Sequence, residues 1–94
     1  MSYVKTIKED FMARIIDGSK MNMIGQNIKK YRKLRGLKQQ ELSNQLELMG
    51  VYVCRGSISR IEDCQRTVTD IELYALAKVL NVSINDLIDH NFFE

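Results

Sequence analysis

Hydrophobic residues recur at spacings of three and four along most of the chain, which is the spacing of one face of an α-helix. The stripe is clear in residues 3–17, where Val4, Ile7, Phe11 and Ile15 fall on one face. Glycines follow several such stretches, as they do at helix C-termini, and the chain has no proline. The pattern predicts five or six short helices, over residues 3–17, 24–35, 39–48, 55–63, 70–81 and 84–88.

Two segments in the second half of the chain carry the polar residues of a helix start. Thr69 precedes Glu72 by three residues, and Ser83 precedes Asp86 by the same interval. In such a capping box the hydroxyl accepts a hydrogen bond from a free backbone amide, and the acidic side chain reaches back to the capping residue. Helices are therefore expected to begin directly after Thr69 and Ser83. The apolar side of the first is expected to hold Ile71, Tyr74, Ala75, Leu76, Val79 and Leu80.

The length of the chain and its helical pattern predict one small all-α domain around a single core. Of the 94 residues, 45% are hydrophobic and 28% are charged, which is ordinary for a globular protein. No apolar run approaches the roughly 18 residues that span a bilayer, and the N-terminus lacks the apolar core of a signal peptide. We therefore expect a cytoplasmic protein without membrane association. The core is expected to include Ile24, Ile28, Tyr31, Leu34, Leu42, Leu46, Ile58 and Ile61.

Charge is distributed unevenly along the chain, although the formal net charge is only +2. Residues 24–66 contain nine basic and four acidic side chains, which gives +5. Residues 67–94 contain one basic and five acidic side chains, which gives −4, and residues 1–23 contain four and three, which adds +1. Such a basic middle segment indicates a polyanionic partner more strongly than net charge does, although a solvated helix face explains it equally well.

Three blocks of residues carry a resemblance to a known family. They read Ile28-x3-Arg32-x2-Arg35-Gly-Leu-x-Gln39-x-Glu41-Leu, then Gly56-Ser-Ile-Ser-Arg-Ile-Glu62, then Leu76-Ala-Lys-Val-Leu-Asn-Val-Ser-Ile-Asn-Asp-Leu87. With them, residues 24–88 resemble the helix-turn-helix domain of the phage-repressor-like, xenobiotic-response-element (XRE) family of transcription regulators. The resemblance implies a five-helix lambda-repressor-like bundle over residues 23–90. Residues 1–22 lie outside the resemblance and are expected to form an N-terminal accessory helix or arm, and residues 91–94 a C-terminal tail.

The resemblance also implies a DNA-reading unit made of the helices over residues 39–48 and 55–63. The first residues of a recognition helix meet base edges in the major groove, where arginine bonds bidentately to guanine. Ile58 and Ile61 would face inward and hold this helix on the core. Gln39 matches a family position that binds a phosphate, an anion that helix N-termini favour. The expected DNA-binding residues are Lys38, Gln39, Gln40, Arg55, Gly56, Ser57, Ser59, Arg60 and Arg66.

Arg32 and Glu62 match two family positions that form an ion pair in many members. The pair would connect the first helix of the domain to the recognition helix. Breaking one partner of such a buried pair commonly costs about 3–5 kcal/mol. Arg32 is therefore expected to be structural and not a DNA contact.

The chain departs from the family pattern in both DNA-reading helices. Lys38 stands where Ser or Thr usually caps the first of them, and Cys54 and Cys64 stand where Ser and Gly are usual around the second. The turn between the two helices is about five residues longer than in the family, around residues 47–51. These residues either extend the helix over 39–48 or form a loop that carries Tyr52.

No catalytic or metal-binding site is evident in the sequence. Cys54 and Cys64 are not spaced as C-x-x-C, and His90 is the single histidine, so one chain cannot assemble a four-ligand zinc site. The cysteines are expected to stay reduced, although a thiol-sensitive regulator is an alternative because Cys54 lies near the expected DNA surface. No acid/base pair or nucleophile can be named, so we expect no enzymatic activity, no cofactor and no small-molecule ligand.

The two ends of the chain leave alternatives open. Residues 1–22 are an accessory helix that packs on the domain or on a second copy, a loosely held arm, or a leader ahead of the domain, and their apolar stripe favours the first. At the C-terminus, exposed aromatic residues often mark an interface, and packing of the tail on its own domain is an equal alternative. The expected dimer residues are Ile84, Leu87, Ile88, Phe92 and Phe93.

These features predict a sequence-specific regulator of transcription that binds double-stranded DNA. We expect a repressor that acts as a homodimer on a palindromic operator, with two recognition helices in successive major grooves about 34 Å apart. The alternative is a protein-interaction module such as an antitoxin, which would use the same helical scaffold and the N-terminal helix to hold a partner.

Overall fold

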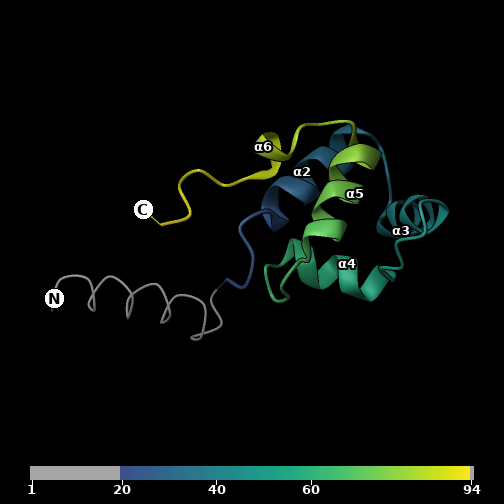
Figure 1. Cartoon of the computed structure of the whole chain (residues 1–94), viewed down its shortest axis with the longest axis horizontal. Helices are drawn as coiled ribbons and strands as arrows, with labels where there is room; N and C mark the ends of the chain where they lie inside the picture. The colour runs from purple at the N-terminus through teal and green to yellow at the C-terminus, as the bar shows by residue number, and fades with distance from the viewer. Residues whose placement is uncertain (1–19, 94) are drawn as a thin grey trace, which may run out of the picture.

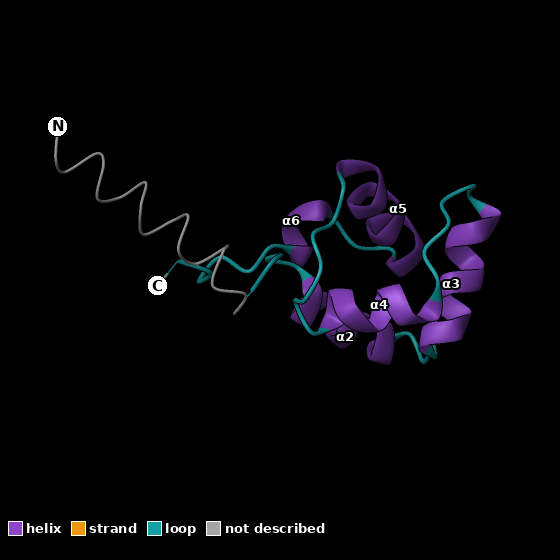
Figure 2. Cartoon of the chain, turned by 90° about the horizontal axis from the view of Figure 1, so that it is seen from below, coloured by secondary structure: helices purple, strands orange, loops and turns teal. Residues whose placement is uncertain are grey.

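The computed structural model describes residues 20–93, and all regular structure in this part of the chain is helical (Figure 1; Figure 2). The all-α prediction is confirmed, and each helix predicted after residue 23 is found with ends that differ by at most one residue. The helix predicted over residues 3–17 lies outside the described residues, as does most of the segment 1–22. The described helices are α2 (Gly25–Leu34), α3 (Gln39–Leu48), α4 (Arg55–Glu62), α5 (Asp70–Leu80) and α6 (Ile84–Leu87).

The core lies between these helices and is built almost entirely of aliphatic side chains. α4 packs against α2 and α3, and α5 packs against α2, α3 and α6. Ile58 and Ile61 of α4 are 0% and 1% exposed, which confirms that they face inward. Burial of a side chain of this size stabilises a fold by about 1.5–3 kcal/mol, so α4 is firmly held. The other fully buried large side chains are Ile28, Leu42, Leu46, Leu76, Leu80 and Leu87.

Three residues that the hydrophobic pattern assigned to the core are exposed instead. On α2, Arg32 takes the inward position one turn after Ile28, and Leu34, which lies on nearly the opposite face, is 65% exposed. On α5, the buried face runs through alanines and leucines in the middle of the helix. Ile71 and Tyr74 lie outside this face and are 67% and 54% exposed, so the prediction that they are core residues is wrong.

Both predicted capping boxes are present. Thr69 Oγ1 accepts a hydrogen bond from the Glu72 amide (3.1 Å), and Glu72 Oε1 accepts one from the Thr69 amide (3.0 Å). Ser83 and Asp86 exchange the equivalent pair of bonds, each 3.0 Å long. α5 and α6 therefore begin where the sequence predicts, because their free N-terminal amides find partners within the chain.

A residue with positive φ closes the last turn of each of the four longer helices. Gly36 follows α2, Gly50 follows α3 and Asn81 follows α5. After α4 this residue is Cys64, with a φ of 59°, at the position where the family resemblance implies glycine. A residue with a Cβ in this conformation costs about 1–2 kcal/mol. Cys64 nevertheless adopts it, with its side chain buried beside Gly25.

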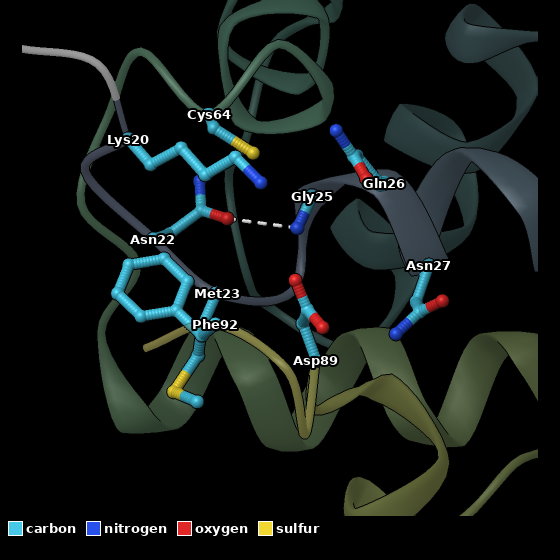
Figure 3. Close-up of a pocket in the computed structure, with 9 residues that line it drawn as sticks. All are labelled: Lys20, Asn22, Met23, Gly25, Gln26, Asn27, Cys64, Asp89 and Phe92. Atoms are coloured by element: carbon cyan, nitrogen blue, oxygen red, sulfur yellow. Dashed lines mark hydrogen bonds between the residues drawn. The ribbon is translucent and has the colours of Figure 1, made fainter. Parts of the chain in front are cut away.

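Asn22 joins the start of α2 to the end of α4, a role that the helical pattern did not predict. Its Oδ1 accepts hydrogen bonds from the amides of Ile24 (3.0 Å) and Gly25 (2.7 Å), and the second of these bonds is drawn in Figure 3. Its Nδ2 donates to the carbonyl oxygens of Ile61 (3.0 Å) and Arg66 (2.9 Å). One side chain thus satisfies two free amides at the start of α2 and two carbonyls near the end of α4. The available signal was that asparagine is favoured at helix starts.

Candidate nucleic-acid interface

α3 and α4 pack against each other and are joined by a connector, residues 49–54 (Figure 1). α3 continues two residues beyond Leu46 before the connector begins, so the lengthened turn is partly helix and partly loop. Ser43 Oγ on α3 donates a hydrogen bond to the Val53 carbonyl (2.7 Å), and the Val53 side chain is buried. The connector is therefore fastened to α3 just before α4 begins.

α4 presents its N-terminal turn to solvent and its opposite face to the core. Arg55, Gly56 and Arg60 are exposed, and Ser57 and Ser59 are half-buried. A guanidinium nitrogen of Arg60 donates to Ser57 Oγ at 3.1 Å. A Cβ on Gly56 would meet no described atom within 4 Å, so the fold itself does not require glycine there. The structure thus brings five of the predicted DNA-binding residues together on one edge, which we call the α4 edge.

Cys54 immediately precedes α4, and its thiol is exposed beside the α4 edge. Its Sγ lies 3.5 Å from Ser57 Oγ. Hydrogen bonds from the Ser57 hydroxyl, and then from the backbone amides of Ser57 and Gly56, lower the pKa of the Cys54 thiol below its ordinary value, and the charge of Arg60 adds to the effect. Cys64 is buried, and both cysteines are free thiols.

The start of α3 carries three residues that are predicted to contact DNA. Gln39 is half-buried, and its Nε2 donates to Glu62 Oε1 at 3.0 Å, which leaves the second amide hydrogen available for another acceptor. Lys38 and Gln40 are exposed. The Lys38 side chain provides no cap for α3, and Glu41 Oε1 accepts a hydrogen bond from the Lys38 backbone amide (2.7 Å).

Arg32 and Glu62 form an ion pair between α2 and α4, in the place that the family resemblance implies. Arg32 Nε donates to Glu62 Oε2 at 2.6 Å, and Nη2 donates to Oε1 at 3.0 Å. Nη1 donates to the Leu37 carbonyl at 2.7 Å. Both charged side chains are buried. Since Gln39 binds the same carboxylate, Glu62 connects α2, α3 and α4 at one point.

Arg66, which is also among the predicted DNA contacts, is bound to other residues of the chain. Its Nη1 and Nη2 donate to Oε1 and Oε2 of Glu72 at 2.9 and 2.8 Å. Nη1 also donates to the Thr67 carbonyl at 2.9 Å. The guanidinium therefore connects the segment that follows α4 to the first turn of α5 through Glu72.

The described residues thus contain two packed helices, the second of which is anchored by buried isoleucines and exposes a polar and basic edge. A family model described as Helix-turn-helix matches residues 28–87, nearly two thirds of the chain. The chain belongs to the helix-turn-helix family. It is a DNA-binding transcription regulator of the XRE type. No curated protein and no solved structure matched the chain.

The five predicted dimer residues in the C-terminal segment of this helix-turn-helix protein differ in their exposure to solvent. Leu87 is 0% exposed because α6 packs against α2 and α5, so Leu87 belongs to the core and not to a dimer surface. Ile84 and Phe93 are exposed, and Ile88 and Phe92 are half-buried. The rings of Phe92 and Phe93 meet edge to face with centroids 4.9 Å apart. Phe92 also lines a cavity of about 100 Å³ beside the start of α2 (Figure 3).

Among residues 20–93 of the helix-turn-helix protein, no helix is both long and apolar enough to cross a membrane. No group of three or more His, Cys, Asp or Glu side chains in the same residues is placed to hold a metal ion.

Acidification is expected to weaken the helix-turn-helix domain through Glu72. The hydrogen bonds from Arg66 hold the pKa of Glu72 below its ordinary value. Because the folded pKa is the lower one, the carboxylate contributes stability that is complete above the ordinary pKa and is lost as the pH falls through the folded pKa. Glu72→Gln should therefore flatten the decline in the free energy of unfolding between about pH 6 and about pH 3, measured by urea denaturation. An equal flattening by Glu47→Gln, at an exposed site on α3, would contradict this prediction.

Proposed function

We propose that this protein reads a specific sequence of double-stranded DNA as a homodimer, and that it represses transcription by occupying a palindromic operator. The observation that carries the proposal is the α4 edge, where Arg55 and Gly56 are exposed and Ser57 is half-buried on a helix anchored by Ile58 and Ile61. A helix held in this way enters a major groove with its N-terminal residues toward the base edges.

The proposal assigns base contacts to α4 and backbone contacts to the start of α3. Arg55 bonds bidentately to guanine O6 and N7, and Ser57 donates to or accepts from a neighbouring base. Gly56 leaves space for a base edge to approach the backbone of α4. At the start of α3, the free amide hydrogen of Gln39 and the ammonium of Lys38 bind phosphate oxygens and fix the register of the protein on the duplex.

The proposed dimer surface consists of the apolar residues of α6 and the tail that are accessible in the structure. The proposal requires a two-fold arrangement through this surface that sets two copies of α4 about 34 Å apart, one in each of two successive major grooves. The operator would then contain two symmetric half-sites. The surface is formed by Ile84, Ile88, Phe92 and Phe93.

Arg55→Ala should abolish the preference for one G·C pair in each half-site. The preference is measured by selecting binding sites from a random duplex library with the wild-type protein and with the variant. On the wild-type site the variant should bind about 1–3 kcal/mol more weakly, because a bidentate contact to guanine is lost. The matched control is Lys78→Ala, which removes an exposed cation from the last turn of α5 and should leave the selected motif unchanged.

The salt dependence of binding tests whether the protein neutralises DNA phosphates when it binds. The logarithm of the binding constant should fall linearly with the logarithm of the salt concentration, by about 0.9 for each phosphate that is neutralised. An unchanged motif with Arg55→Ala would contradict the assignment of α4 as the recognition helix. Absent or salt-independent binding to every duplex would favour the protein-interaction alternative.

A further inference from the structure

The connector carries one exposed aromatic residue on a backbone that is held at both ends. At its start, the Val51 amide donates to the Leu46 carbonyl at 3.0 Å, and at its end Ser43 binds the Val53 carbonyl. Val51 packs against the core and Val53 is buried, whereas Tyr52 between them is 77% exposed. The lengthened turn therefore presents the Tyr52 ring to solvent from a fixed position.

Tyr52 lies on the rim of a shallow depression that is continuous with the α4 edge. The depression has a volume of about 410 Å³ and lies between α3, the connector and the start of α4. Gln40 and Asn44 line it from α3 and are joined by a 3.0 Å hydrogen bond from Nε2 to Oδ1. Arg55 and Ser57 line it from α4. Glu47, an acidic residue, also lines it, so an anionic group is expected to bind on the side of Arg55.

We propose that the Tyr52 hydroxyl donates a hydrogen bond to a phosphate oxygen of the DNA strand next to the base that Arg55 reads. This inference rests on the proposed function, because it uses the same docking of α4. Tyrosine is among the side chains that commonly bind DNA phosphates, and its phenolic hydroxyl can donate a hydrogen bond to a phosphate oxygen. The side chain has few rotatable bonds and the connector is fastened, so little conformational entropy is lost when the contact forms.

A phosphate contact does not depend on base sequence, so a random-sequence duplex of known length tests it without knowledge of the operator. Tyr52→Phe removes the hydroxyl and keeps the ring. The variant should bind this duplex about tenfold more weakly than the wild-type protein at every salt concentration, as expected for the loss of one hydrogen bond to a charged acceptor. The slope of binding against salt should be unchanged, because the substitution removes no cationic side chain.

Two comparison variants test whether the weaker binding is specific to the loss of the Tyr52 hydroxyl. Lys38→Gln removes a cation that is proposed to bind phosphate, so it should reduce the slope of the salt dependence by about 0.9. Tyr74→Phe removes the hydroxyl of another exposed tyrosine, on α5 and outside the depression, and should leave both affinity and slope unchanged. The midpoint of thermal unfolding checks that each variant is folded, and the exposure of Tyr52 predicts no change in it.

Three outcomes would overturn the inference. If Tyr52→Phe binds as well as the wild-type protein while Tyr52→Ala binds weakly, the ring makes the contact and the hydroxyl does not. If both variants bind normally, Tyr52 does not meet the DNA, although the proposed function stands. If the wild-type protein itself shows no salt-dependent binding to duplex DNA, the proposed function fails together with the inference, and this result precedes any comparison of variants.

Discussion

Glu62→Ala should lower the free energy of unfolding by about 3–5 kcal/mol, a large part of the roughly 5–15 kcal/mol that keeps a single domain folded. The substitution leaves the Arg32 guanidinium buried without a counter-charge, and it removes the acceptor of the Gln39 amide. Urea denaturation followed by circular dichroism at a fixed pH measures the loss. If the variant is already unfolded in buffer, its circular dichroism spectrum without urea lacks the helical signal of the wild-type protein.

The control for this prediction separates lost charge compensation from lost packing. In the double variant Arg32→Met with Glu62→Leu, aliphatic side chains fill the space of both charges, and such replacements are often neutral or stabilising. Most of the lost stability should therefore return. Glu47→Ala removes an exposed carboxylate from α3 and should change stability by less than about 0.5 kcal/mol. A Glu62→Ala variant as stable as the wild-type protein would contradict the burial of the pair.

The helices could be predicted because their signals are local. Thr69 and Glu72 stand three residues apart, so the capping box that begins α5 is visible in the sequence and is found in the structure. The buried face of a helix depends instead on its neighbours. On α2 this face is turned toward Arg32, whose partner Glu62 is thirty residues away, and Leu34 is exposed as a result.

The sequence also did not show which partners Arg66 and Asn22 bind in the folded chain. The residue type indicates that an arginine after the recognition helix is suited to a phosphate, but it does not show which acceptor within the chain the side chain binds. Glu72 has two carboxylate oxygens, and it accepts hydrogen bonds from Arg66 as well as from the Thr69 amide. Asn22 binds the Ile61 carbonyl thirty-nine residues away, and no spacing rule relates the two.

The length of the turn before α4 could be counted from the sequence, but its division between helix and loop could not. Gly50, with a φ of 81°, ends α3 two residues after Leu48 and turns the chain into the connector. Val51 and Val53 both pack into the core, on either side of Tyr52. The Tyr52 side chain between them therefore points to solvent, where it can make a contact that the family pattern does not include.

Gly25→Ala should lower the free energy of unfolding by about 1–3 kcal/mol, or the thermal midpoint by roughly 5–20 °C. A Cβ on Gly25 would overlap the carbonyl oxygen of Ile61 and lie 3.0 Å from Cys64 Sγ. The carbonyl cannot easily turn aside, because it accepts hydrogen bonds from Asn22 Nδ2 and from the Cys64 amide, each at 3.0 Å. Relief therefore requires α2 to move away from α4.

Gly56→Ala is the matched control, because it makes the same substitution in another helix where a Cβ would meet no described atom within 4 Å. There the loss of glycine flexibility in the unfolded chain should stabilise the protein by about 0.5–1 kcal/mol. The two variants should therefore change the thermal midpoint in opposite directions. Equal midpoints would mean that the start of α2 does not lie against the end of α4, and the hydrogen bonds of Asn22 to both helices would then have to be abandoned as well.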